Sequence, residues 1–193
     1  MDNDQPPTVG PLQQRANEVE TAVLRSAGFF KEIPARETLI LRLMVLLGRE
    51  ISALLEEILE PRGLSETEYR TLMMLVSQPD GIAHPSDLCA DVAQSPANMT
   101  RVADGLYERG LITRVASEED RRRTILRITP AGESLVRTLL PDTTERVRAI
   151  FAEMSQPARS ALLEHLRSLL VRIDQCAPGS AAAAGGQMLR SST

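Results

Sequence analysis

The stretch SPANMTRVADGLYERGLITRVASEEDRRRTILRITPAG, residues 95–132, decides the fold. It opens on Ser95-Pro96, where the serine oxygen can accept a hydrogen bond from a free backbone amide and the proline suits the first helical position. Gly110 stands where a glycine commonly ends a helix. These signals predict a helix that begins at Ser95 and ends before Gly110.

Two β-type segments, 111–115 and 124–128, follow that helix, and Thr129-Pro130 signals the start of another. Residues 118–123 between the segments carry three acids and then three arginines. Taken alone, such a charge run favours a solvated loop. Because this charge run lies one strand beyond a predicted helix, we interpret it as a loop tip that contacts DNA. The planar guanidinium group of arginine suits phosphates and narrow minor grooves. A helix and ribbon of this kind can reach both grooves of DNA together.

The run DRR at 120–122 with LRITPAG at 126–132 resembles the D-x-R…h-x-h-T-x-x-G signature (h, apolar) of the wing in MarR-type winged helix-turn-helix regulators. Residues 85–92 resemble the first helix of the helix-turn-helix, and residues 98–112 resemble the recognition helix with its L-x-x-x-G-L-h ending. The resemblance covers residues 35–174. It implies a mainly α fold with a small β-wing, in which N- and C-terminal dimerisation helices flank the winged helix-turn-helix.

The same resemblance implies which residues contact double-stranded DNA. Arg122, or one of its neighbours, would enter the minor groove, and Asp120 would hold that arginine through a charge-assisted hydrogen bond. Side chains in the first turns of the recognition helix would lie near bases and phosphates. The predicted DNA-contacting residues are Ser95, Asn98, Thr100, Arg101, Asp120, Arg121, Arg122 and Arg123.

Charge and composition agree with a local DNA surface. The 193-residue chain has a net charge of −4, and its 42% hydrophobic but 3% aromatic content indicates a helical protein with an aliphatic core. Residues 95–128 contain seven arginines and five acids, a net +2, so the rest of the chain carries −6. This balance excludes a generally basic nucleic-acid coat, and any contact with DNA must be local.

Helical apolar spacing extends on both sides of the wing. It runs through 37–60, and from Thr129 to Met154 with a bend expected at Pro141, and then through 158–173. A capping box at Ser65 starts a further helix that ends near residue 77. These helices carry more apolar residues than a winged helix module needs for its own core.

The apolar surplus predicts a homodimer on a pseudo-palindromic site, with a monomer under a large helical cap as the alternative. We predict five parts: a disordered head (1–10), N-terminal helices of the dimerisation region (11–62), a winged helix-turn-helix DNA-binding domain (63–129), C-terminal helices of the dimerisation region (130–176) and a disordered tail (177–193).

Enzyme chemistry is not predicted. His84 and His165 have no second metal ligand at a recognisable spacing, and the chain has no phosphate-binding glycine loop and no nucleophile elbow. We therefore expect no catalytic residue, no metal and no cofactor. With two cysteines, no apolar run of membrane-spanning length and an acidic first segment, the sequence predicts a cytoplasmic protein without a membrane partner.

The resemblance further implies a small-molecule effector, an aromatic carboxylate or a phenolic compound, that relieves a repressor. Such a ligand needs an apolar cleft with a cationic or hydrogen-bonding group. Arg49 could instead be an exposed ion-pair partner of Glu50 or Glu56. The candidate ligand-binding residues are Arg49, Tyr69, Met73 and His84.

Two alternative functions stay open on the sequence. A redox-responsive repressor would use Cys89 or Cys176, although Cys89 is better interpreted as a small core residue. A winged helix can also serve as a protein–protein scaffold, which would tolerate the loss of Arg101 or Arg122.

Overall fold

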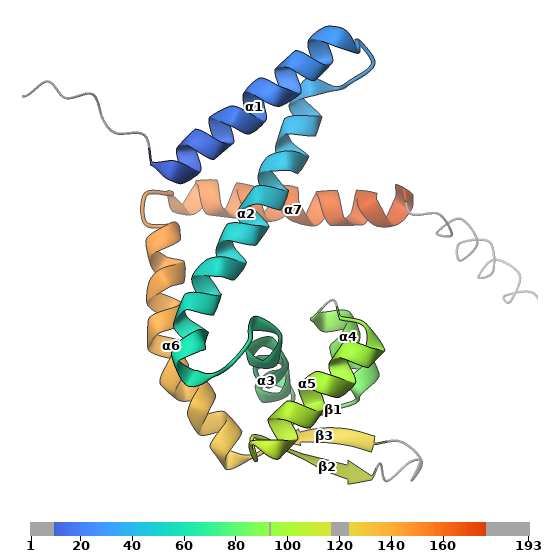
Figure 1. Cartoon of the computed structure of the whole chain (residues 1–193), viewed down its shortest axis with the longest axis vertical. Helices are drawn as coiled ribbons and strands as arrows, with labels where there is room; N and C mark the ends of the chain where they lie inside the picture. Colours follow the sequence, from blue (N-terminus) through green and yellow to red (C-terminus); the bar gives the residue numbers. More distant parts are fainter. Residues whose placement is uncertain (1–9, 93, 117–123, 177–193) are drawn as a thin grey trace, which may run out of the picture. The chain divides into compact units, whose positions relative to one another are not determined.

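The computed structural model describes residues 10–92, 94–116 and 124–176, and it is mainly helical with one small sheet (Figure 1). No helix in these ranges is both long enough and apolar enough to cross a membrane. The predicted fold class is confirmed. In chain order the elements are α1 (Pro11–Phe29), α2 (Ala35–Leu59), the 3-10 turn η1 (Glu60–Arg62), α3 (Glu66–Ser77), β1 (Ile82–Ala83), α4 (Pro85–Asp91), α5 (Pro96–Glu108), β2 (Ile112–Ala116), β3 (Thr124–Ile128), α6 (Pro130–Ile150) and α7 (Gln156–Cys176).

The sheet has three antiparallel strands in the order β1-β3-β2. The β2–β3 ribbon was predicted, and its register pairs Ile112 with Ile128. Strand β1 was not predicted, because two residues show no periodicity. It is held by its partner: Ile82 pairs with Arg127, and the amide of Ile128 donates to the carbonyl of Gly81 at 2.9 Å.

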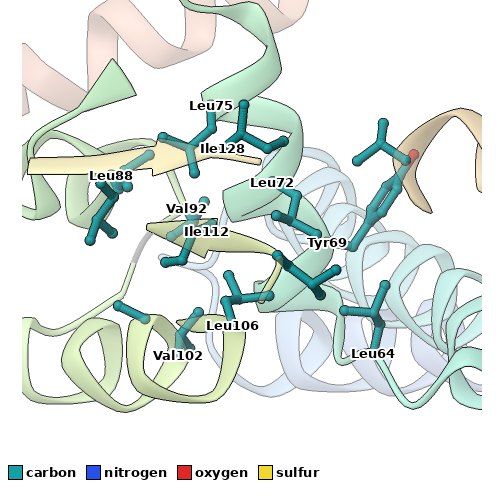
Figure 2. Close-up of a cluster of buried hydrophobic side chains, with 14 of the residues drawn as sticks. Leu64, Tyr69, Leu72, Leu75, Leu88, Val92, Val102, Leu106, Ile112 and Ile128 are labelled. Carbon is teal, nitrogen blue, oxygen red and sulfur yellow. The ribbon is translucent and has the colours of Figure 1, made fainter. Parts of the chain in front are cut away.

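The core of the winged module draws on residues far apart in the sequence. Fully buried side chains come from α3 (Leu72), α4 (Leu88), α5 (Leu106) and β2 (Ile112), and Figure 2 shows these four within one cluster. Leu59 at the end of α2 and Val136 and Leu139 in the first half of α6 belong to the same cluster. Each fully buried leucine contributes about 1.5–3 kcal/mol through removal of its apolar surface from water. The flanking helices are therefore fixed to the winged module at the ends that adjoin it.

The predicted capping signals are present. Ser65 Oγ accepts from the amide of Glu68 at 3.2 Å, and a carboxylate oxygen of Glu68 accepts from the amide of Ser65 at 2.8 Å, which together form the predicted capping box. Ser95 caps α5 with Pro96 in the first turn. Gly110 has φ +68, the left-handed conformation that glycine adopts after a helix.

The end of α6 differs from the prediction. The helix stops at Ile150, and Phe151 and Met154 lie in the turn that follows. The expected continuation of the helix to Met154 was therefore wrong. The reason is a new helix start: the hydroxyl oxygen of Ser155 accepts from the amide of Ala158 at 3.4 Å, and Pro157 has no amide hydrogen that could continue α6. Arg159 donates to the carbonyls of Phe151 at 2.6 Å and Met154 at 2.9 Å in the turn between the two helices.

Two compact units divide the chain after Thr143, within α6. Pro141 lies inside this helix, and because it has no amide hydrogen it removes one backbone hydrogen bond there. The hydroxyl of Thr143 donates to the carbonyl of Leu139 at 3.0 Å and lies 3.4 Å from the hydroxyl of Tyr69, which can donate to it. The bend expected at Pro141 stays a prediction.

The start of α6 is held against the end of α5 by the T-x-x-G part of the motif. The Thr129 hydroxyl donates to the carbonyl of Gly110 at 2.8 Å and accepts from the amide of Gly132 at 3.1 Å. A Cβ added to Gly132 would lie 2.3 Å from the carbonyl oxygen of Leu111 and 2.9 Å from the Ile128 side chain. Glycine is required at position 132 because the backbone of α6 lies so close to the backbone of Leu111 that no side chain fits between them.

We predict that Gly132→Ala destabilises the fold by about 2–3 kcal/mol, since the added methyl group must push α6 away from Leu111. Urea unfolding at fixed protein concentration measures the change. Gly28→Ala is the matched control: it also lies in a helix but has no atom within 4 Å of the added Cβ, so it changes stability by no more than about 1 kcal/mol. If the two variants are equally stable, the close approach of α6 to Leu111 does not require glycine at position 132.

Candidate nucleic-acid interface

Helix α5 has one buried face and one exposed face. The buried residues Met99, Val102, Ala103 and Leu106 recur at helical spacing and pack in the core. Thr100 and Arg101 lie on the opposite side and are exposed. The structure thus leaves a polar helix face open to a partner, as the sequence predicts.

Ser95 has a structural task at the beginning of this face. Its hydroxyl oxygen accepts from the amide of Asn98 at 3.3 Å, which satisfies one of the free amides of the first turn. The side chain is exposed. Ser95 can therefore cap α5 and still lie within reach of a molecule that approaches the N-terminal end of the helix.

A chain of hydrogen bonds orients Arg101. Its guanidinium donates to Asn98 Oδ1 at 2.9 Å, and Asn98 Nδ2 donates in turn to Gln94 Oε1 at 2.5 Å. Gln94 was not among the predicted site residues, because it precedes the helix cap and no local pattern marks it. The half-buried Asn98 thus positions Arg101 as much as it offers a contact of its own.

A second cluster joins the first wing strand to α5. Arg114 on β2 forms an ion pair with Asp104, and its guanidinium carbon lies 5.4 Å from the centre of the Tyr107 ring. An exposed ion pair contributes at most about 1 kcal/mol, and a cation–π contact at an exposed site adds a similar amount. The main effect of Arg114 is therefore geometric, since it fixes the strand relative to the helix. Sequence reasoning missed this cluster because it depends on the direction in which β2 leaves α5.

Arg109 links the end of α5 to the end of α2. Its guanidinium donates to the carbonyl of Gly63 at 2.7 Å and to the carbonyl of Arg62 at 3.0 Å. Both carbonyls lie at the connection that follows α2, where Gly63 has φ +61. Arg109 therefore connects the residues that follow α2 to the C-terminal end of α5.

The predicted wing-tip residues Asp120, Arg121, Arg122 and Arg123 lie outside the described residues, so their roles stay predictions. The two strands that lead to the tip are paired along their full length, from Ile112 with Ile128 to Ala116 with Thr124.

The roles of the four predicted effector residues stay predictions. Tyr69 is buried, and Met73 and His84 are half-buried. Only Arg49 lines the cavity of about 440 Å³ between α1 and α2. The alternative interpretation of Arg49 as the partner of Glu50 is not supported, because Glu50 pairs with Arg15 at 3.0 Å.

The described residues show no metal centre, since no three His, Cys, Asp or Glu side chains among them converge. Cys89 is half-buried against the core, in agreement with its interpretation as a small core residue, and Cys176 is exposed.

The sequence comparisons agree with this geometry. The MarR family model matches residues 64–124. The transcriptional repressor MprA of Escherichia coli K12 is 30% identical over 157 residues, which cover 81% of this chain and 89% of the repressor. The chain belongs to the MarR family of winged helix-turn-helix regulators and is a DNA-binding transcription regulator.

Solved structures show the same fold. Sco3205, a MarR family regulator of Streptomyces coelicolor in complex with DNA, superposes with a TM-score of 0.67 at 20% identity over 76% of this chain and 91% of its own. BpsR of Bordetella bronchiseptica, whose DNA binding is regulated by 6-hydroxynicotinic acid, superposes with a TM-score of 0.60 at 21% identity over 72% of this chain and 94% of its own.

Ser95 allows a test that separates its capping role from contact with DNA. Ser95→Asp keeps a good N-cap, so the free energy of unfolding stays within about 0.5 kcal/mol of the parent protein, whereas Ser95→Ala lowers it by about 1 kcal/mol. The new carboxylate would repel phosphates and weaken DNA binding in the stable variant. Urea unfolding and a DNA titration measure the two effects, and unchanged DNA affinity in Ser95→Asp would remove Ser95 from the interface.

Proposed function

We propose that this regulator is a homodimeric repressor that α5 and the wing hold on a pseudo-palindromic operator in the cytoplasm. A small aromatic acid or a phenolic compound releases it, and the protein acts by binding without catalysis. The observation that carries the proposal is the exposed Thr100 and Arg101 face of α5, whose arginine is held in place by Asn98.

The way in which α5 is attached to the rest of the protein supports its proposed contact with DNA. Its C-terminal end is fastened through Arg109 and through the contacts of Thr129 and Gly132, while its N-terminal end carries Ser95 and the exposed polar residues. The helix dipole makes a helix N-terminus favourable for phosphates. An α-helix presented in this way fits the major groove.

We predict that Arg101→Ala weakens binding to mixed-sequence duplex DNA by roughly tenfold at low salt, because one phosphate or base contact is lost. The slope of log affinity against log salt concentration should become shallower by about one. Arg36→Ala, which removes an exposed arginine of α2, is the control and should leave both quantities unchanged. If Arg101→Ala binds DNA as the parent protein does, the alternative function as a protein–protein scaffold is favoured.

Exposed apolar residues support the dimer. On α2, Ile40, Leu47 and Ile51 are 52%, 60% and 47% exposed, and their spacing places them on one face of the helix. On α7, Leu170 and Ile173 are 64% and 56% exposed. Apolar stripes of this kind mark protein–protein contact surfaces. A second copy of the chain is the partner that two-fold DNA recognition requires.

We predict that Leu170→Glu shifts the protein from dimer to monomer in sedimentation at micromolar concentration, because a carboxylate is costly in an apolar contact. Ser168→Glu adds the same charge at an exposed position two residues away, on another side of α7, and should remain dimeric. A parent protein that sediments as a monomer would contradict the dimer directly.

An effector can release DNA only if it favours one arrangement of the two recognition helices over another. The Arg109 contacts with Arg62 and Gly63 supply a route for this effect, because they connect the end of α2 to α5. The behaviour of BpsR supports a small organic acid as the signal. A titration of aromatic carboxylates into the protein–DNA complex tests this step, and no loss of DNA affinity with any of them would contradict it.

A further inference from the structure

Three polar side chains, Gln94, Asn98 and Arg101, form a hydrogen-bond relay at the N-terminal end of α5. The guanidinium of Arg101 donates to Asn98 Oδ1 at 2.9 Å, and Asn98 Nδ2 donates to Gln94 Oε1 at 2.5 Å. Spacings of four and three residues bring the three side chains to one side of the helix. Gln94 and Asn98 are half-buried, whereas Arg101 is exposed. The relay therefore starts at the protein body and ends at the surface proposed to contact DNA.

The relay has only one consistent direction. A guanidinium group contains donors alone, so Arg101 requires the oxygen of the Asn98 amide on its side. The NH₂ group of the same amide then faces Gln94, where it requires an acceptor. A donor at position 94 would turn the Asn98 amide over and place its NH₂ group against the guanidinium. The acceptor at position 94 therefore sets the orientation of Asn98 and, through it, the position of Arg101.

The backbone at position 94 is held by two helices. The amide of Gln94 donates to the carbonyl of Cys89 in α4 at 2.9 Å. The next residue, Ser95, caps α5 through the amide of Asn98 at 3.3 Å. The relay thus begins at a fixed point between α4 and α5. An arginine that is oriented before DNA arrives loses less side-chain freedom when it binds.

The relay also decides which of its side chains can bind a base edge. An asparagine that binds adenine uses its oxygen and its NH₂ group together, and in Asn98 both groups are engaged within the protein. Arg101 uses Nη2 for the bond to Asn98, while Nη1 and Nε are not part of the relay. The commonest specific contact of arginine is with the O6 and N7 acceptors of guanine. Asn98 therefore acts as a support, and Arg101 is the member of the relay that can bind a base.

We propose that Gln94 determines base specificity: it fixes the Asn98 amide so that Arg101 binds a guanine of the operator. Gln94 is a positioning residue that acts through Asn98 and Arg101 and has no base contact of its own. The inference rests on the proposed function, because it requires that Arg101 lies against the bases.

The experiment begins with selection from a pool of random-sequence duplexes, carried out with the parent protein and with Arg101→Ala. The position at which the parent selects guanine and Arg101→Ala does not is the base bound by Arg101. Titration of the selected duplex, and of a second duplex with adenine at that position, gives the guanine preference as the ratio of the two affinities. The parent should prefer guanine by about tenfold. Because the preference is a ratio for one protein, any loss of folded protein in a variant cancels from it.

Charged variants of Gln94 separate the relay from simple attraction to phosphates, because affinity and preference should change independently. Gln94→Glu keeps an acceptor but repels phosphates, so its overall affinity falls while its guanine preference stays within about twofold of the parent value. Gln94→Lys offers only donors and attracts phosphates, so it binds more tightly at low salt but loses guanine preference by about threefold or more. The neutral Gln94→Met, which has no comparable acceptor, should lose preference to the same extent.

Gln13→Lys is the matched control. Gln13 on α1 also bonds to an asparagine four residues later, with its Nε2 donating to Asn17 Oδ1 at 3.3 Å. The substitution adds the same charge as Gln94→Lys without touching the relay. Its guanine preference should equal that of the parent protein.

Three results would overturn the role of Gln94. These are a parent-like guanine preference in Gln94→Met and Gln94→Lys, an equal loss of preference in Gln94→Glu and Gln94→Met, or selection of a base other than guanine at the Arg101 position. In each case the proposed function stands, since the parent still selects a sequence through Arg101. If the parent enriches no sequence, or Arg101→Ala enriches the same one, the proposed contact of Arg101 with DNA fails and the inference fails with it.

Discussion

The first turn of α6 approaches the backbone of Leu111 so closely that no side chain fits at Gly132, and the geometry of the winged module depends on this contact. Four elements meet there: the end of α5 at Gly110, the beginning of β2, the end of β3 and the beginning of α6. The Thr129 hydroxyl joins the same point by bonding to the Gly110 carbonyl. Because backbone atoms form the closest contact of this junction, it constrains the angle between α5 and the sheet tightly.

Several attachments of α5 outside its core face lie in the C-terminal half of the helix. Arg109 reaches back to the carbonyls that follow α2, and Arg114 holds β2 against Asp104 and Tyr107 nearby. The N-terminal end carries the capping serine and the oriented Arg101. Helix α5 is therefore anchored towards its C-terminal end and exposes Ser95 and Arg101 towards its N-terminal end.

Sequence reasoning succeeded where the physical cause is local. Caps at Ser65 and Ser95, the glycine at 110 and the β2–β3 ribbon all depend on residues a few positions apart. It failed where partners are distant: β1 exists only because β3 pairs with it, and Arg109 finds its carbonyls 46 and 47 residues away. The contact between the hydroxyls of Tyr69 and Thr143 is another pairing between distant residues, 74 positions apart in the sequence. The candidate effector residues Arg49, Tyr69, Met73 and His84 stay predictions.

Selection from a pool of random duplexes tests most directly whether two copies of the α5 surface bind DNA together. We expect an enriched pseudo-palindrome whose half-sites lie about 10 base pairs apart, or a multiple of that spacing, since two-fold related recognition helices enter the same side of the duplex. A pool without enrichment, or an enriched single half-site without symmetry, would contradict it.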